Sequence, residues 1–84
     1  NVRIFLEAAR QIGVAPENIL FVGDLISKDV AGSLAAGMTA VLKTGPSNAG
    51  KTVPQGVHRI DRIAELPPLI ERINTAQRVH PQGR

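Results

Sequence analysis

Apolar residues near the start of the chain recur every three or four positions, which is the spacing of an amphipathic helix. The pattern consists of Val2, Ile4, Phe5, Leu6, Ala8, Ala9 and Ile12. Gly13 follows, and glycine commonly ends a helix because it adopts a left-handed backbone conformation there. We therefore expect a helix that ends before Gly13. It has no capping residue and no methionine before it, so we expect the chain to be a segment of a longer protein.

Two short, continuous apolar runs have the pattern of strands that are buried on both faces of a parallel sheet. The first run covers residues 19–22 and the second covers residues 39–43. Between them, Ser27 is placed to cap a helix, Asp29 would lie in its first turn, and Gly37 would end it. The pattern predicts a strand–helix–strand unit with parallel strands and a right-handed connection.

The rest of the chain predicts a loop, a short strand and a helix. Residues 44–56 are rich in glycine and proline, as loops are, and residues 57–60 have the pattern of a short edge strand. Apolar residues from 63 to 73 mark a final helical region, in which Pro67 and Pro68 restart the helix. The expected fold class is α/β, an incomplete Rossmann-like core made of a parallel βαβ unit with flanking helices.

Composition narrows the class of protein. The 84 residues allow one domain, which we expect over residues 1–76, followed by a frayed basic tail at 77–84. With two Phe and no Trp or Tyr, stacking on nucleic-acid bases is not expected. The absence of cysteine excludes thiolate metal sites. No segment has the pattern of a membrane span or signal peptide, so we expect a cytoplasmic protein without nucleic-acid or membrane partners.

The candidate chemistry follows the first strand. Gly23 and Asp24 come directly after residues 19–22, and Asp29 lies five positions after Asp24. Ligands of open α/β sheets bind outside the carboxyl ends of the strands, and two carboxylates there suit Mg²⁺ shared with a phosphate. The alternative is purely structural: Asp24 begins a turn, and Asp29 interacts favourably with the helix dipole.

The segment from residue 20 to residue 42 resembles the fourth motif of the haloacid dehalogenase (HAD) superfamily. The residues that carry the resemblance are Leu20-Phe21-Val22-Gly23-Asp24, Asp29-Val30-Ala31-Gly32 and Ala35-Ala36-Gly37-Met38-Thr39-Ala40-Val41-Leu42. The first helix, the turn at residues 14–18 and the segment 62–70 are also similar to that family. The resemblance covers roughly residues 1–73.

The resemblance implies a Rossmann-like core of a Mg²⁺-dependent phosphohydrolase that acts through an aspartyl-phosphate. It implies that Asp24 is a direct Mg²⁺ ligand and that Asp29 is a second carboxylate beside the metal, or a ligand through water. Gly23 allows the chain to turn without a side chain that blocks the ligand. The implied substrate is a phosphorylated small molecule, with phosphatase favoured over dehalogenase, phosphonatase and mutase. Family members choose their substrates with a cap that lies outside these residues.

The chain also departs from the family pattern. It contains no Asp-x-Asp nucleophile motif, and Arg3 lies too far into the first helix to serve as the third-motif cation. We therefore expect a C-terminal fragment of a HAD-like core domain that is inactive alone and whose partner is the missing N-terminal half of that domain. Because the strand at 19–22 would lack a neighbour, we expect the isolated chain to dimerise or swap elements. The alternative is a noncatalytic α/β module that binds a cation or a protein.

Residues 45–52 match the pattern G-x-x-x-x-G-K-[ST] of a phosphate-binding P-loop. A P-loop requires a helix that begins at Lys51 and Thr52, but Pro54 and Gly56 follow instead. A surface loop is therefore the favoured interpretation, and a nucleotide-binding protein is the less favoured alternative.

Three further side chains have less specific signals. Lys43 ends the second strand at the same edge of the sheet as Asp24, where it would contact a phosphate or simply be solvated. His58 and His80 are too far apart in sequence to suggest a zinc site, so we expect both on the surface.

Overall fold

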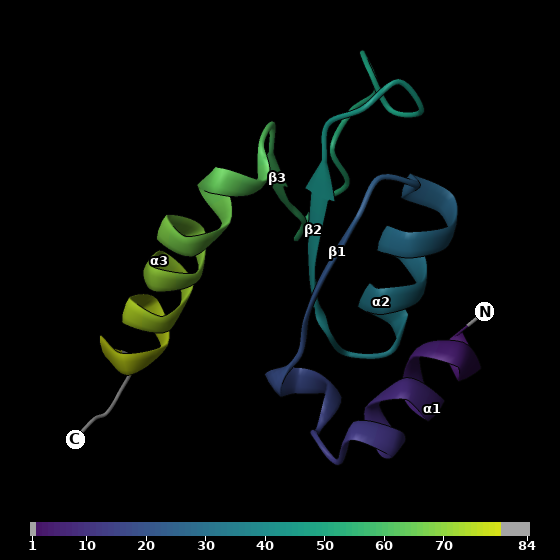
Figure 1. Ribbon diagram of the computed structural model, residues 1–84, viewed down its shortest axis with the longest axis vertical. Coiled ribbons are helices and arrows are strands. Elements are labelled where there is room, and N and C mark those ends of the chain that lie inside the picture. Colours follow the sequence, from purple (N-terminus) through teal and green to yellow (C-terminus); the bar gives the residue numbers. More distant parts are fainter. Residues whose placement is uncertain (1, 80–84) are drawn as a thin grey trace.

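The computed structural model describes residues 2–79, in which helices pack on both faces of a three-stranded parallel sheet (Figure 1). The elements are α1 (Val2–Ile12), β1 (Leu20–Gly23), α2 (Ala31–Ala35), β2 (Thr39–Lys43), β3 (His58–Ile60) and α3 (Leu66–Val79). Two 3-10 turns, at Pro16–Asn18 and Ile63–Glu65, and a π-helical turn at Ile26–Val30 complete the structure. The α/β class and the parallel unit with flanking helices are confirmed.

The strand order is β1-β2-β3, so β2 is the central strand. Leu20 of β1 pairs with Thr39 of β2, and Lys43 of β2 pairs with Ile60 of β3, both in parallel register. Among the described residues, β1 has no strand on its outer edge. Its sequence is of the type that is buried on both faces, yet it lies at the edge of the sheet.

The side chains of β2 alternate between two cores. Leu42 packs with Val30 on the face that α2 covers, whereas Val41 packs with Leu69 on the face that α3 covers. Figure 1 shows α1 and α2 on one side of the sheet and α3 on the other. The middle of β2 is therefore enclosed from both sides.

Helix α1 packs on α2 through a glycine. A Cβ at Gly32 would collide with the ring of Phe5, so the missing side chain lets the two helices approach closely. The Phe5 ring also meets Phe21 of β1 edge-on, with ring centroids 5.0 Å apart. Ala9 and Met38 are buried in the same cluster. Helix α1 is thus fixed both to α2 and to the edge strand.

Most expected boundaries agree with the structure. Helix α1 ends before Gly13, which has the positive φ of 71° expected at a helix end, and β2 has the expected bounds. Strand β1 lies one residue later than expected. The prediction that Ser27 caps a helix is wrong: the helical turn begins at Ile26, and Leu25 occupies the capping position.

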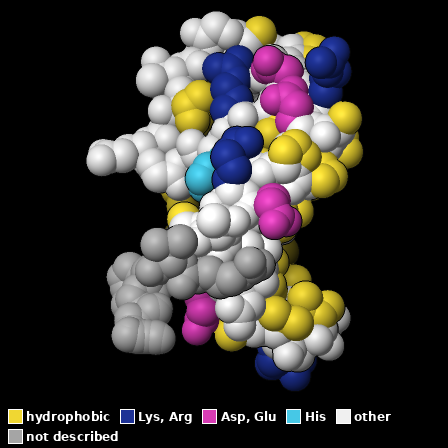
Figure 2. Space-filling model, turned by 90° about the vertical axis from the view of Figure 1, so that its left-hand side faces the viewer, with side chains coloured by type: hydrophobic (Ala, Val, Ile, Leu, Met, Phe, Trp, Pro, Cys, Tyr) yellow, Lys and Arg dark blue, Asp and Glu magenta, His cyan; other side chains and the backbone are white. Residues whose placement is uncertain are grey.

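The C-terminal helix α3 continues through Val79, past the expected end of the domain at residue 76. The rest of the expected basic tail, residues 80–84, lies outside the described residues. On the face of the molecule that α3 covers, Lys and Arg side chains lie close to Asp and Glu side chains (Figure 2). None of the helices within residues 2–79 combines the length and the apolar content that crossing a membrane requires.

Candidate functional site

The carboxyl end of β1 places Gly23 and Asp24 at one end of the sheet. Asp24 directly follows the last residue of β1, and β2 ends beside it, because Gly23 pairs with Leu42. Ligands of parallel α/β sheets bind at this end of the strands. Asp24 is exposed, and within residues 2–79 its carboxylate has no hydrogen-bond or ion-pair partner. The strand thus presents a free carboxylate where the fold favours ligand binding.

A cleft of about 450 Å³ opens beside Asp24, between the ends of β1 and β2 and the loop that follows β2. It is lined by Val22, Gly23, Asp24, Lys43, Thr44, Gly45, Pro46 and Ile63. As expected, Lys43 lies at the same edge as Asp24, and its Nζ makes a long hydrogen bond of 3.4 Å to the Thr44 carbonyl oxygen. The cleft therefore holds one carboxylate and one ammonium group, which are suited to a cation and an anion respectively.

Asp29 approaches the end of β1 from the other side of Gly23. Its Oδ2 accepts a hydrogen bond of 3.3 Å from the backbone N–H of Leu25. A Cβ at Gly23 would lie 2.5 Å from the Cβ of Asp29, so this glycine is what lets Asp29 pack against the strand end. Asp29 lines the hollow between α1 and β1 rather than the cleft beside Asp24. The two predicted carboxylates therefore flank Gly23 and open into different hollows.

Carboxylates are the protein ligands of a hard cation that keeps part of its water shell. Mg²⁺ commonly takes one or two protein carboxylates and completes its octahedral shell with water and phosphate oxygens. Asp24 offers a free carboxylate, and Asp29 offers one that Leu25 already orients. In the part of the chain that the structure describes, no three His, Cys, Asp or Glu side chains are grouped to hold a metal ion. Within residues 2–79, a cation at this strand end would therefore find at most these two carboxylates.

An apolar groove of about 530 Å³ runs between α1 and the outer edge of β1. Its lining residues are Ile4, Phe5, Ala8, Ala9, Ile12, Ile19, Phe21, Lys28, Asp29 and Met38. Two of them are large and mostly exposed, Ile4 at 70% and Ile12 at 64%. The open edge of β1 and a hydrophobic helix face thus lie next to each other, as at a surface that binds another polypeptide.

The segment with the P-loop pattern does not form a phosphate-binding loop. Residues 46–50 are turns, and the backbone after Lys51 is not helical. The Gly45 N–H donates to Asn48 Oδ1, and the N–H groups of Asn48 and Lys51 donate to carbonyl oxygens within the loop. Both requirements of a P-loop are therefore unmet, because these amides are occupied and no helix follows. The structure does not support the nucleotide-binding alternative.

Sequence reasoning did not single out Asn48, which links the ends of two strands. Its side chain is fully buried, and Nδ2 donates to the carbonyl oxygens of Asp24, at 2.8 Å, and Lys43, at 2.9 Å. The local signal was its place in a turn-forming segment, where asparagine is common. That signal does not reveal a contact with a residue 24 positions earlier in the chain.

A second polar link joins β2 to β3 near the cleft. Thr44 Oγ1 donates to Asp61 Oδ1 at 2.6 Å and accepts from Arg59 Nε at 2.9 Å. His58 is half-buried at the start of β3, beside Leu69 of α3, and His80 lies outside the described residues. These two hydrogen bonds of Thr44 connect the end of β2 to β3 and to the residue that follows it.

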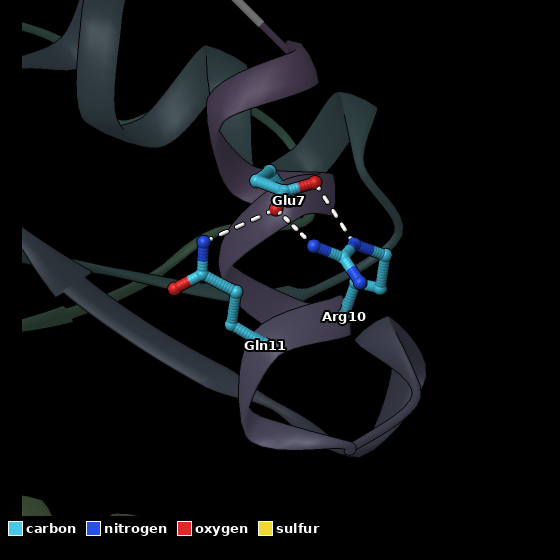
Figure 3. A network of polar contacts seen from close by, with 3 residues as sticks. All are labelled: Glu7, Arg10 and Gln11. Carbon is cyan, nitrogen blue, oxygen red and sulfur yellow. Dashed lines mark hydrogen bonds and ion pairs between the residues drawn. The ribbon is translucent and has the colours of Figure 1, made fainter.

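Two side chains on the exposed face of α1, outside the cleft, have shifted pKa values. Glu7 accepts hydrogen bonds from Arg10 and Gln11, with 3.0 Å between Arg10 Nε and Glu7 Oε1 (Figure 3). The Arg10 guanidinium, and to a smaller extent the Gln11 amide, lowers the pKa of Glu7. The same contact raises the pKa of Arg10. This network stabilises the helix surface and has no part in the cleft.

Comparison with known proteins agrees with this geometry. The model of the HAD-hydrolase-like family matches residues 1–67. A glyceraldehyde 3-phosphate phosphatase from Methanopyrus kandleri is 51% identical over 41 residues, which are 49% of this chain and 18% of the relative. The enzyme of the same name from Methanothermobacter thermautotrophicus is 45% identical over 42 residues, or 50% of this chain and 19% of the relative. The parallel sheet is consistent with this family, and the match over residues 1–67 shows that the chain belongs to the HAD-like hydrolases.

Proposed function

We propose that this chain is the C-terminal part of the core domain of a Mg²⁺-dependent phosphatase, in which Asp24 is the metal ligand. The observation that carries the proposal is the exposed, unpartnered Asp24 carboxylate at the carboxyl end of β1, inside the segment that the HAD-like family model matches. Asp29 would act beside it as the second carboxylate, either on the metal or through water. Gly23 between them provides the space that Asp29 occupies.

In this role, residues of this chain would bind and orient Mg²⁺, and none of them would act as the nucleophile. Mg²⁺, when bound, would neutralise charge on a phosphoryl group. Asp24 would hold the ion at the mouth of the cleft, and Leu25 would keep the Asp29 carboxylate turned toward the strand end. The chain lacks an Asp-x-Asp nucleophile, so we expect the isolated 84 residues to be catalytically inactive.

The proposed substrate is a small phosphate monoester. Both relatives are named glyceraldehyde 3-phosphate phosphatases, so this compound is the first to test. The cleft beside Asp24 contains Lys43, whose ammonium group would favour an anionic substrate. The alignments cover less than a fifth of each relative, so the substrate of the whole protein is part of the proposal.

We further propose that the missing N-terminal half of the core domain covers the open edge of β1. Two observations support this partner: β1 has no outer neighbour within residues 2–79, and the apolar groove beside it exposes Ile4 and Ile12. A further strand along β1 would satisfy its free backbone groups, and apolar side chains would fill the groove.

The first experiment is to read the coding sequence upstream of Asn1. An apolar strand that ends in Asp-x-Asp, with a lysine shortly before Asn1, is the expected result. An upstream stop codon or an unrelated domain would leave Asp24 without a nucleophile. That outcome would overturn the phosphatase proposal in favour of a noncatalytic cation-binding or interaction module.

The second experiment measures phosphatase activity of the complete protein with and without Mg²⁺. Asp24→Asn should lower kcat/KM by more than about a hundredfold, because loss of mere supporting groups already costs 10–100-fold. Glu17→Gln, which removes an exposed carboxylate far from the cleft, is the matched control and should leave activity unchanged. Full activity of Asp24→Asn would contradict the assigned role.

A further inference from the structure

Asn48 is a fully buried polar residue inside an otherwise exposed loop. Its relative exposure is 0%, whereas the residues on either side of it, Ser47 and Ala49, are exposed. A buried amide is stable only when its hydrogen-bonding groups have partners. The partners of Asn48 therefore indicate what this side chain does.

Those partners lie at the ends of two neighbouring strands. Nδ2 donates one hydrogen bond to the carbonyl oxygen of Asp24, at 2.8 Å, and another to that of Lys43, at 2.9 Å. Oδ1 accepts a third from the N–H of Gly45, at 3.2 Å. A single side chain thus ties the end of β1, the end of β2 and the loop that forms one wall of the cleft.

The carbonyl oxygen of Asp24 receives two donors in total. Ser47 Oγ donates to it at 3.0 Å, in addition to Asn48 Nδ2. Both lone pairs of this oxygen are therefore occupied, and the peptide plane after Asp24 is held in one orientation. The backbone oxygen is not free to bind a cation, so Asp24 offers a ligand only through its carboxylate.

We propose that Asn48 is a positioning residue, which fixes the backbone of Asp24 so that its carboxylate stays directed at the metal site. The inference rests on the proposed function, because it assumes that Asp24 binds the cation. It assigns to the loop at residues 45–50 a role that its P-loop pattern does not suggest. The loop holds the strand end from which the metal ligand projects.

The requirement is specific for an amide. Aspartate has nearly the same shape, but at neutral pH it has no N–H groups and would place an oxygen against two carbonyl oxygens. Alanine would remove all three hydrogen bonds and leave the two carbonyl oxygens without their buried donor. Asn48→Asp therefore tests the donors, and Asn48→Ala tests the whole contact.

The experiment uses the complete protein labelled with ¹⁵N and ¹³C, because residues 2–79 offer two carboxylates and no third grouped ligand. It is titrated with Mn²⁺ as a paramagnetic substitute for Mg²⁺. Broadening of the amide signals of residues 23–25 and 29 reports binding at this site. The Mn²⁺ midpoint should rise roughly tenfold in Asn48→Ala and Asn48→Asp, which is the scale seen for residues that orient metal ligands. The ¹³C signal of the Asp24 carbonyl should move in both variants, because it loses a hydrogen bond.

Ser33→Ala is the matched control for stability. Ser33 is also fully buried and makes one hydrogen bond, to the Val30 carbonyl oxygen at 3.1 Å, but it does not line the cleft. It should destabilise the chain without changing the Mn²⁺ midpoint of the folded protein. Asn48 variants that behave like Ser33→Ala, with lower stability and an unchanged midpoint, would overturn the proposal.

Two further outcomes are separated by the same data. If the unsubstituted protein shows no Mn²⁺ effect at Asp24, the metal role of Asp24 fails. If Asn48→Ala leaves the Asp24 carbonyl signal and the ¹⁵N relaxation of residues 23–25 unchanged, the positioning role of Asn48 fails as well. If neither Asn48 variant folds, the unsubstituted protein decides: a hydrogen-bond scalar coupling between the Asn48 side-chain nitrogen and the Asp24 carbonyl carbon, and slow exchange of that side-chain amide, are expected. Absence of the coupling together with fast exchange would overturn the proposal.

Discussion

Strands β1 and β2 are neighbouring apolar strands of one sheet, but they differ in how completely they are covered. Ala40, Val41 and Leu42 of β2 are at most 1% exposed, whereas every residue of β1 is only half-buried. Strand β2 has a neighbour on both edges, and within residues 2–79 β1 has one. An apolar run thus predicts a strand of the type that is buried on both faces, but it does not predict how many strands lie beside it within residues 2–79.

The largest expected effect on stability comes from replacing a leucine by alanine in β2, compared with the same substitution in β1. Leu42→Ala should lower the free energy of unfolding by about 2–5 kcal/mol, because it leaves a cavity in an enclosed core. Leu20→Ala should cost less than about 2 kcal/mol, because that side chain already borders solvent. Urea denaturation followed by circular dichroism measures both. Equal losses would show that β1 is covered in solution, and repeating the measurement at several protein concentrations would show whether a second copy covers it.

The next effect compares two glycines at the ends of these strands. Gly23→Ala should cost about 1–3 kcal/mol, because the new Cβ would lie 2.5 Å from the Cβ of Asp29 and the π-helical turn would have to move. Gly45→Ala should change stability by less than about 0.5 kcal/mol, because its Cβ would lie 3.9 Å from Asp24 Oδ2, an ordinary contact. Thermal unfolding of the two variants in parallel measures the difference. A neutral Gly23→Ala would mean that Asp29 is not packed against the strand end.

A smaller effect concerns the groove beside β1. We expect the average mass of the chain in sedimentation equilibrium to rise above 8.9 kDa with concentration, because β1 and the groove are open. Ile4→Lys combined with Ile12→Lys should return the mass toward the monomer with little loss of stability, since both side chains are mostly exposed. Ile63→Lys, at a residue that is 54% exposed and outside the groove, is the control. A chain that stays monomeric at all concentrations would contradict the expectation.

The smallest effect concerns the Glu7–Arg10 contact on the solvent-exposed face of α1. Its contribution to the free energy of unfolding should not depend on what covers β1. The Arg10 guanidinium lowers the pKa of Glu7, so this contact stabilises the folded state above the unfolded pKa of Glu7. That contribution is lost as the pH falls through the lowered pKa. An NMR titration of the Glu7 carboxyl should therefore show a midpoint that rises in Arg10→Gln. An unchanged midpoint would show that the contact is not formed in solution.

The sequence was sufficient for features that depend on short-range patterns. The spacing in α1 and the run that forms β2 are local, and so is the place of Asp24 after β1. The Ser27 prediction was wrong because the helical turn begins at Ile26, so that Leu25, two residues before Ser27, occupies the capping position. The Asp29 carboxylate accepts from the Leu25 N–H. The spacing of residues alone did not show where this helical turn begins.

The burial of Asn48 is a feature that a local sequence pattern cannot predict. Its burial depends on carbonyl oxygens of Asp24 and Lys43, which only the folded sheet brings together. The nearby glycines and lysine match the P-loop pattern, but Pro54 and Gly56 favoured a surface loop. The structure agrees with the surface loop, because N–H groups of Gly45, Asn48 and Lys51 donate within the loop. A buried polar contact between distant segments leaves no periodic signal in the sequence.

The all-parallel order of the sheet also has a consequence for how the chain acquires its structure. No two of its strands are joined by a hairpin, so each strand pair forms only after a long intervening segment has closed into a loop. During synthesis, β1 leaves the ribosome well before β2, its first partner within residues 2–79. Contacts of this kind slow folding and prolong the exposure of apolar segments. Within residues 2–79, β1 therefore lacks its neighbour β2 until the ribosome has completed α2 and β2.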